Sequence, residues 1–312
     1  MPESPARCIA VMGATATGKS ALGVRLARRL GGEVVSMDSC QVYRGMDIGT
    51  GKITPAETEG VRHHLLDILD PDESGSAGRH AELAREAVAD IAGRGLVPVL
   101  VGGTGLYFDA FSRPFIDPGV PSQQFDAIRS GFEGRDTGDL YAELAGVDPA
   151  RAEKLSANDR VRITRALELY LATGVPMSEL LAEQRAQEAT GDCLELVLTM
   201  PREKLRDRIA RRTRALYEAG WVEEVRRLEA AGYGPSSPGM RSLGYEEIGA
   251  ALGAGDDPAD TAGTVITRTQ QYAKRQETYF RRFSDAIWLD VSDPDFNERA
   301  LMLSEAFLGR PE

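Results

Sequence analysis

The sequence predicts an α/β protein in which a parallel sheet is flanked by helices and carries an all-helical insertion domain. Two observations predict this class. Short apolar runs alternate with helical patterns in the first and last thirds of the chain, and the middle shows helical patterns alone. Buried runs that alternate with helices are typical of parallel strands covered on both faces.

Five apolar runs are the expected strands of this sheet. Helical patterns at 20–30 and 80–93 separate the first three, as strand–helix–strand units require. The two later runs look like further strands of the same sheet. The expected strands cover 8–12, 33–37, 96–101, 194–200 and 286–291.

The segment between the third and fourth expected strands shows helical patterns only, and its clearest helix covers 160–173. Asn158 and Asp159 offer side-chain oxygens for the N-cap, and Gly174 can take the left-handed position that ends a helix. We therefore expect three segments. Residues 1–113 form the first part of the core, residues 114–189 form a helical insertion that contacts the macromolecular substrate, and residues 190–312 complete the core.

Composition limits the classes of function. The 312 residues carry 37 Lys and Arg against 48 Asp and Glu, a net charge of −11, which argues against non-specific binding to a duplex. Basic residues still cluster at 202–214 and 268–282, so a local nucleic-acid face is compatible with the charge. The three cysteines have no metal-ligand spacing, no signal peptide is visible, and no apolar stretch could span a membrane. We expect a cytoplasmic monomer.

The strongest motif is G-x-x-x-x-G-K-S, which lies between the first expected strand and the first helix. Its backbone N–H groups would cradle phosphate oxygens at the positive end of the helix. Lys19 would neutralise the terminal phosphates and Ser20 could hold Mg²⁺. The fold is therefore expected to be P-loop NTPase-like. The expected diphosphate- or nucleotide-binding residues are Gly13, Ala14, Thr15, Ala16, Thr17, Gly18, Lys19 and Ser20.

An acid follows the second expected strand, whereas Gly102, Gly103 and Thr104 follow the third. Ligands of open α/β sheets bind beyond the carboxyl ends of the strands, so Asp38, Thr104 and the phosphate loop should share one crevice. Such a crevice would contain a loop that holds pyrophosphate, together with a carboxylate and a hydroxyl. These groups suit nucleophilic attack on a substrate that releases pyrophosphate. On these residues alone, Asp38 could still be a helix N-cap, and Thr104 could serve as a cap or form a turn hydrogen bond.

Five segments together resemble the tRNA dimethylallyltransferases, the bacterial tRNA isopentenyltransferase family. They occur in the family's order and span most of the chain. The segments are DSCQVYRGMDIGTGK at 38–52, HHLLD at 63–67, GGTGLY at 102–107, ND with the arginines and RALE at 158–168, and QYAKRQ with YFRR at 271–282.

The resemblance implies transfer of a dimethylallyl group from dimethylallyl diphosphate to N6 of the adenosine 3′ of the anticodon, position 37. The acceptors would be tRNAs that read codons starting with U. Asp38 would accept the proton of the amine, and Thr104 would help to place the allylic carbon. The phosphate loop, Lys19 and Mg²⁺ would hold the departing diphosphate, although the same loop pattern also occurs in ATP-binding proteins.

The resemblance also implies contacts with the tRNA anticodon stem-loop, from which the adenine must leave its stack. Arg162, Arg165, Arg241 and Tyr245 have side chains of the kind that stack on loop bases. The expected tRNA-binding residues are Asp38, Ser39, Cys40, Gln41, Val161, Arg162, Ile163, Thr164, Arg165, Arg241, Ser242, Leu243, Gly244, Tyr245 and Glu246.

Three other functions stay open at this point. One is an isopentenyltransferase acting on free AMP, ADP or ATP, and another is a P-loop kinase of small metabolites. The third is a non-catalytic nucleotide- or RNA-binding module, which would not depend on Asp38. The helical insertion and the segment 241–246 favour tRNA, because a free nucleotide needs neither.

Overall fold

The computed structural model describes residues 6–113, 122–186 and 192–309. The chain divides into two compact units, one made of residues 1–112 with 191–312 and the other of residues 113–190. The first unit contains a parallel sheet flanked by helices, as the sequence predicts, and the described residues of the second unit form helices joined by turns, with no strand.

The sheet has six parallel strands in the order β3-β2-β4-β1-β5-β6. All five expected strands are confirmed, with ends within two residues of the predicted ones. The edge strand β3 was not predicted, because two residues are too short to show a pattern. The strands are β1 (Arg7–Gly13), β2 (Gly32–Ser36), β3 (His63–His64), β4 (Val97–Gly102), β5 (Asp192–Thr199) and β6 (Ile287–Asp290).

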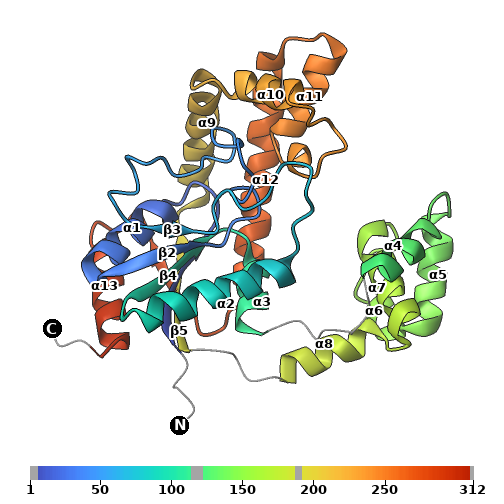
Figure 1. Cartoon of the computed structure of the whole chain (residues 1–312), viewed down its shortest axis with the longest axis horizontal. Helices are drawn as coiled ribbons and strands as arrows, with labels where there is room; N and C mark the ends of the chain where they lie inside the picture. The colour runs from blue at the N-terminus through green and yellow to red at the C-terminus, as the bar shows by residue number, and fades with distance from the viewer. Residues whose placement is uncertain (1–5, 114–121, 187–191, 310–312) are drawn as a thin grey trace. The chain divides into compact units, whose positions relative to one another are not determined.

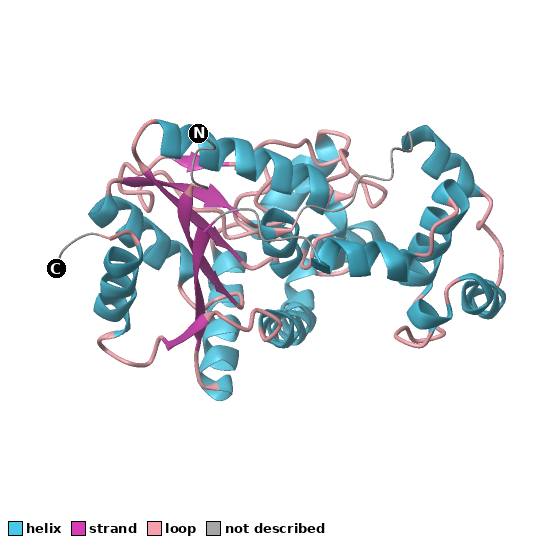
Figure 2. Cartoon of the chain, turned by 90° about the horizontal axis from the view of Figure 1, so that it is seen from below, coloured by secondary structure: helices cyan, strands magenta, loops and turns pink. Residues whose placement is uncertain are grey.

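Helices cover both faces of this sheet (Figures 1 and 2). Successive residues of a strand point to opposite faces, so Ile9 and Val11 of β1 pack on one side and Ala10 and Met12 on the other. The first side is covered by α1 (Lys19–Leu30) and α13 (Phe296–Phe307), and the second by α2 (Ala77–Gly93) and α3 (Gly105–Ser112).

A second group of helices stands beyond the carboxyl ends of the strands (Figure 1). Its core contains Trp221, Val225 and Tyr245, and the loop that follows β2 packs into it through Val42 and Met46. The group comprises α9 (Arg202–Glu218), α10 (Trp221–Ala230), the 3₁₀ turns η1 (Gly239–Arg241) and η2 (Pro258–Thr261), α11 (Tyr245–Ala254) and α12 (Ala262–Phe280).

The second unit has its own small core of Phe132, Leu140, Leu144, Ile163 and Leu167. Its longest helix has the predicted limits, because Asp159 accepts the N–H of Arg162 at 3.2 Å and Gly174 ends the helix with a φ of 73°. The helices of this unit are α4 (Ser122–Ser130), α5 (Thr137–Val147), α6 (Pro149–Ala152), α7 (Arg160–Thr173) and α8 (Met177–Ala186).

None of the helices in the described parts of the chain is both long enough and apolar enough to cross a membrane.

Candidate active site

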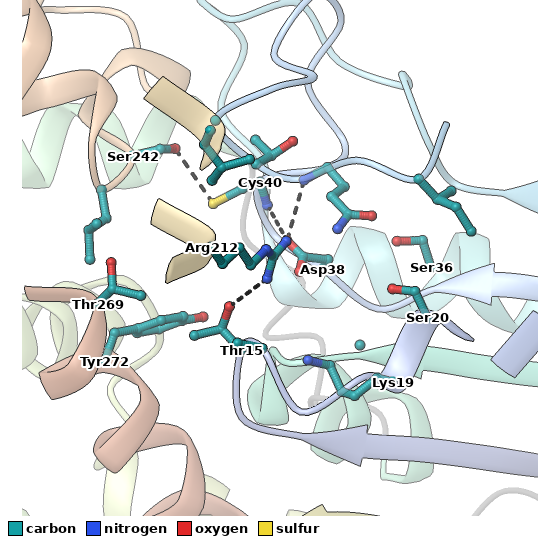
Figure 3. Close-up of a pocket in the computed structure, with 18 of the residues that line it drawn as sticks. Thr15, Lys19, Ser20, Ser36, Asp38, Cys40, Arg212, Ser242, Thr269 and Tyr272 are labelled. Carbon is teal, nitrogen blue, oxygen red and sulfur yellow. Dashed lines mark hydrogen bonds between the residues drawn. The ribbon is translucent and has the colours of Figure 1, made fainter. Parts of the chain in front are cut away.

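A pocket in the first unit lies where the strands end (Figure 3). Its walls come from the phosphate loop, the loop after β2, helices α9 to α12 and the segment before α11. Residues that line it include Thr15, Ala16, Lys19, Ser20, Ser36, Asp38, Cys40, Gln41, Gly49, Thr50, Arg212, Trp221, Ser242, Leu243, Tyr245, Thr269, Tyr272 and Gln276.

The phosphate loop is shaped by its own backbone. Gly13 and Gly18 have φ angles of 150° and 98°, which glycine adopts without strain. A Cβ atom on Gly13 would also lie 2.7 Å from the carbonyl oxygen of Leu198. Helix α1 begins at Lys19 with no side chain capping its first N–H groups. These N–H groups therefore have no side-chain partner at the start of α1, as the expected anion site requires.

Gln276 ties this loop to the end of β4. Its Oε1 accepts the backbone N–H of Thr15 at 2.9 Å, and its Nε2 donates to the carbonyl oxygen of Gly103 at 2.8 Å. This contact was missed by sequence reasoning, although Gln276 lies in the quoted segment 271–276, which could have drawn attention to it.

Lys19 lies within the loop and lines the pocket. Its Nζ donates to the carbonyl oxygen of Ala14 at 3.0 Å. Burial lowers the pKa of Lys19 to about 8; the negative charge of Asp38 opposes this shift and the positive charge of Arg212 adds to it. An incoming phosphate would therefore meet a poorly solvated cation, which strengthens their attraction.

Two arginines of α9 reach the phosphate loop. Arg212 donates from Nη1 to the hydroxyl of Thr15 at 3.2 Å, and Nη2 of Arg208 would lie 3.5 Å from a Cβ atom on Gly18. Burial lowers the pKa of Arg212, with the charge of Asp38 acting in the opposite direction. The guanidinium groups are one helical turn apart, so both can approach the same anion.

Asp38 turns its carboxylate into the pocket. Oδ1 accepts the N–H groups of Cys40 at 2.9 Å and of Gln41 at 3.3 Å, whereas Oδ2 has no hydrogen bond within the described residues. No helix starts here, so the alternative that Asp38 is a helix N-cap is wrong. One oxygen orients the carboxylate and the other remains for a ligand.

Thr104 lies beside Asp38 but is not among the described residues that line the pocket. Its Oγ1 accepts the N–H of Ser39 at 3.1 Å and donates to the hydroxyl of Ser39 at 3.3 Å. A further hydrogen bond joins it to the hydroxyl of Tyr272, whose pKa is raised mainly by burial. The expected grouping of Asp38 with the phosphate loop is confirmed, and Thr104 joins them through Ser39 and Tyr272.

Two segments far apart in sequence meet at the other side of Asp38. The thiol of Cys40 donates to the hydroxyl of Ser242 at 3.6 Å, and the residues after each, Gln41 and Leu243, both line the pocket. Burial, together with the charge of Asp38, raises the pKa of Cys40 to about 11, so this thiol stays protonated at neutral pH.

The structure contradicts the base-stacking role expected of Tyr245. The side chain is 1% exposed, its hydroxyl donates to Glu224 at 2.6 Å, and its ring packs edge to face on Trp221 at 5.6 Å. Gly244 is buried beside the same indole. Tyr245 therefore supports the pocket from the core and has no exposed face for a loop base. Arg241 is exposed, and Glu246 pairs with Arg268.

The expected contact at Ile163 is also contradicted, because this side chain is 0% exposed in the core of the second unit. The neighbouring positions of α7 do reach the surface. Val161 is 78% exposed, Arg162 pairs with Asp159, and Arg165 lies over the ring of Phe125 at 5.1 Å. The half-buried Thr164 bonds back to its own helix. A helix of period 3.6 cannot expose five successive side chains.

The described residues hold no group of three or more His, Cys, Asp or Glu side chains that could bind a metal ion alone. A phosphate-loop Mg²⁺ does not need such a group, because one hydroxyl, phosphate oxygens and water complete its shell. Ser20 is exposed in the first turn of α1 and lines the pocket with Ser36 (Figure 3). The donors present fit a metal ion that arrives with a phosphorylated ligand.

Fold and pocket together define a P-loop protein in which the phosphate loop and a carboxylate line the same pocket. The family model described as IPP transferase matches residues 41–283. The chain is 44% identical to the tRNA dimethylallyltransferase of Geobacter metallireducens over 92% of this chain and 94% of that one. It is 41% identical to the enzyme of the same name from Streptomyces griseus over 97% of each.

Solved structures agree with the sequence comparisons. The chain superposes on a eukaryotic dimethylallyltransferase acting on tRNA with a TM-score of 0.84 and 30% identity, over 98% of this chain and 80% of that one. The tRNA isopentenylpyrophosphate transferase of Bacillus halodurans gives a TM-score of 0.72 at 35% identity, over 97% and 96%. The chain belongs to the IPP transferase family, whose similar curated members are tRNA dimethylallyltransferases.

Proposed function

We propose that this protein transfers a dimethylallyl group from dimethylallyl diphosphate to N6 of adenosine 37, 3′ of the anticodon, in tRNAs that read codons starting with U. One observation carries the proposal: Asp38 and the phosphate loop line the same pocket, so a proton acceptor lies beside a holder of diphosphate. The names of the similar proteins supply the class of reaction.

The exocyclic amine is a poor nucleophile, because its lone pair is delocalised into the adenine ring. Oδ2 of Asp38 would accept one amine proton as the bond from N6 to C1 of the allyl group forms and the bond from C1 to the diphosphate oxygen breaks. Oδ1 is already occupied by two N–H groups, which fixes the direction of Oδ2. Thr104 and Tyr272 would hold Ser39, and with it Asp38, in place.

The diphosphate leaves with its electron pair and gains negative charge. Lys19, Arg208, Arg212 and the first N–H groups of α1 would stabilise that charge, since Lys19 and Arg212 line the pocket and Arg208 reaches the phosphate loop at Gly18. Mg²⁺, held by Ser20, would supply further positive charge to the diphosphate when bound.

The acceptor base would enter from the side of Cys40, Gln41 and Ser242, after leaving the anticodon-loop stack. Arg241 and the exposed residues of α7, Val161, Arg162 and Arg165, would contact the RNA around it. Free nucleotides would gain nothing from α7, which favours tRNA as the acceptor.

The test supplies Mg²⁺ and labelled dimethylallyl diphosphate with either an unmodified anticodon stem-loop or AMP. We expect label in the stem-loop alone. Label in AMP would identify an adenylate isopentenyltransferase instead. Consumption of ATP with a small metabolite, and no labelled acceptor, would identify a kinase and contradict the proposal.

A further inference from the structure

Two walls of the pocket are loops, and the backbone of each is bound by a buried polar side chain of a distant helix. The phosphate loop, 13–20, forms the wall on the side of the diphosphate. The loop 38–52 forms the opposite wall, and it contains neither helix nor a strand of the sheet. Gln276 holds the first wall and Glu224 holds the second.

Glu224 lies on α10 and is 1% exposed. Its Oε2 accepts the N–H groups of Asp47 at 3.0 Å and Ile48 at 2.8 Å. Its Oε1 accepts the N–H of Gly49 at 3.0 Å and the hydroxyl of Tyr245 at 2.6 Å. Three successive backbone N–H groups therefore close on one carboxylate, which fixes the direction of the turn that they form.

This turn is continuous with the pocket wall. Gly49 and Thr50 line the pocket, and a Cβ atom on Gly49 would lie 1.9 Å from Nε1 of Trp221, so the turn has no room to move towards α10. The end of the loop is fixed separately, since the buried Lys52 donates to the carbonyl oxygen of Tyr43 at 2.7 Å and to Asp67 at 2.6 Å. Glu224 thus fixes the position of the turn 47–49, which belongs to the same loop and the same pocket wall as Asp38 and Gln41.

Gln276 acts in the same way on the opposite wall. It is 6% exposed on α12 and spans from the N–H of Thr15 to the carbonyl oxygen of Gly103, the residue before Thr104. A Cβ atom on Gly103 would lie 2.4 Å from its Nε2, so the amide fills the gap between the two loops. The phosphate loop is therefore held at a fixed distance from the end of β4.

We propose that Gln276 and Glu224 are positioning residues for different substrates: Gln276 places the diphosphate donor, and Glu224 places the adenine acceptor. This inference rests on the proposed function. Neither side chain needs to touch a reacting atom, because each acts through the backbone that it holds. Among the described residues, the hydrogen-bond partners of Gln276 and of Glu224 are entirely different.

The two residues are matched controls for each other, since both are buried and both hold a loop. Gln276→Met keeps the size of the side chain and removes its hydrogen bonds, and Glu224→Gln replaces acceptors by an amide that cannot accept all four donors. We expect Gln276→Met to raise KM for dimethylallyl diphosphate and Kd for inorganic diphosphate about 10-fold, the effect of about one lost hydrogen bond. KM for the stem-loop should change by less than about 2-fold on the same scale. Glu224→Gln should raise KM for the stem-loop about 10-fold and change both constants for the diphosphates by less than about 2-fold.

Parallel changes in both substrates' constants would overturn the inference, because general loosening of the fold does not distinguish donor from acceptor. If Glu224→Gln does not fold, Tyr245→Phe removes one of the four bonds to the same carboxylate, and we expect it to raise KM for the stem-loop alone, by about 3-fold. An unchanged stem-loop KM in that variant would equally contradict the role of Glu224. A wild-type protein that binds inorganic diphosphate but labels no acceptor would refute the proposed function, whereas the diphosphate arm would still test Gln276.

Discussion

The two walls of the pocket reach their shapes in different ways. The phosphate loop is shaped locally, by two glycines with positive φ and by the start of α1. The loop 38–52 depends on partners far along the chain; Glu224, which binds its turn, is 177 residues away from Asp47. A short motif can therefore specify the shape of the first wall, and Gln276 then fixes its position against the end of β4. The second wall takes its shape only when α10 and α11 have packed.

This difference explains which parts could be predicted from the sequence. The strands other than β3, together with α7 and the phosphate loop, follow from local patterns and were predicted. Glu224 was missed, because a glutamate in a helix usually indicates a solvated face. Tyr245 was wrongly expected to stack on a loop base, because no sequence pattern shows which side of a short helix packs into the core. The meeting of Cys40 with Ser242 depends on tertiary packing, which spacing does not encode.

The largest effect is expected from removing the carboxylate of Asp38, which tests whether the two walls of the pocket act in the same reaction. Asp38→Ala should lower kcat by about 10²–10⁴-fold, the usual contribution of a general base, and leave stem-loop affinity within about 2-fold. Single-turnover transfer and RNA titration measure the two quantities. Asp256→Ala, at an exposed aspartate after α11, is the control and should behave as wild type. Unchanged turnover without the Asp38 carboxylate would remove Asp38 from the mechanism.

The next effect concerns the phosphate loop alone. Lys19 is charged below its lowered pKa of about 8, so kcat/KM for dimethylallyl diphosphate should fall as pH rises through this value. Lys19→Ala should lower the same quantity about 10²-fold at pH 7, because a donor to the leaving group is lost. Lys19→Arg should shift the alkaline fall to higher pH, since arginine keeps its charge. A pH profile that is the same with lysine and arginine would contradict the assignment.

A smaller effect tests the opposite wall. Gly49→Ala places a Cβ atom 1.9 Å from Nε1 of Trp221 and should lower the free energy of unfolding by about 1–3 kcal/mol through overpacking. A Cβ atom on Gly253 of α11 would meet nothing within 4 Å, so Gly253→Ala should stabilise the protein by about 0.5–1 kcal/mol. Denaturant titration of both variants gives the comparison. Equal stability of the two would show that the turn at Gly49 is not held against α10.

The smallest effect concerns α7, outside the pocket. Arg162 is exposed and pairs only with Asp159 in the described structure, so Arg162→Ala should weaken stem-loop binding about 3-fold and reduce its salt dependence. Binding of dimethylallyl diphosphate should stay the same. Arg299→Ala on α13 is the control, at another exposed arginine of a surface helix. Stem-loop affinity that is independent of salt would contradict the role of a basic flank.

The most direct test compares two stem-loops that differ only in the residue 3′ of the anticodon, adenosine in one and inosine in the other. Inosine keeps the purine but replaces the exocyclic amine by oxygen, so Asp38 has no amine proton to accept. The account predicts that labelled dimethylallyl diphosphate modifies the adenosine stem-loop alone, with N6-dimethylallyladenosine as the nucleoside recovered after digestion. Equal labelling of both stem-loops would contradict it.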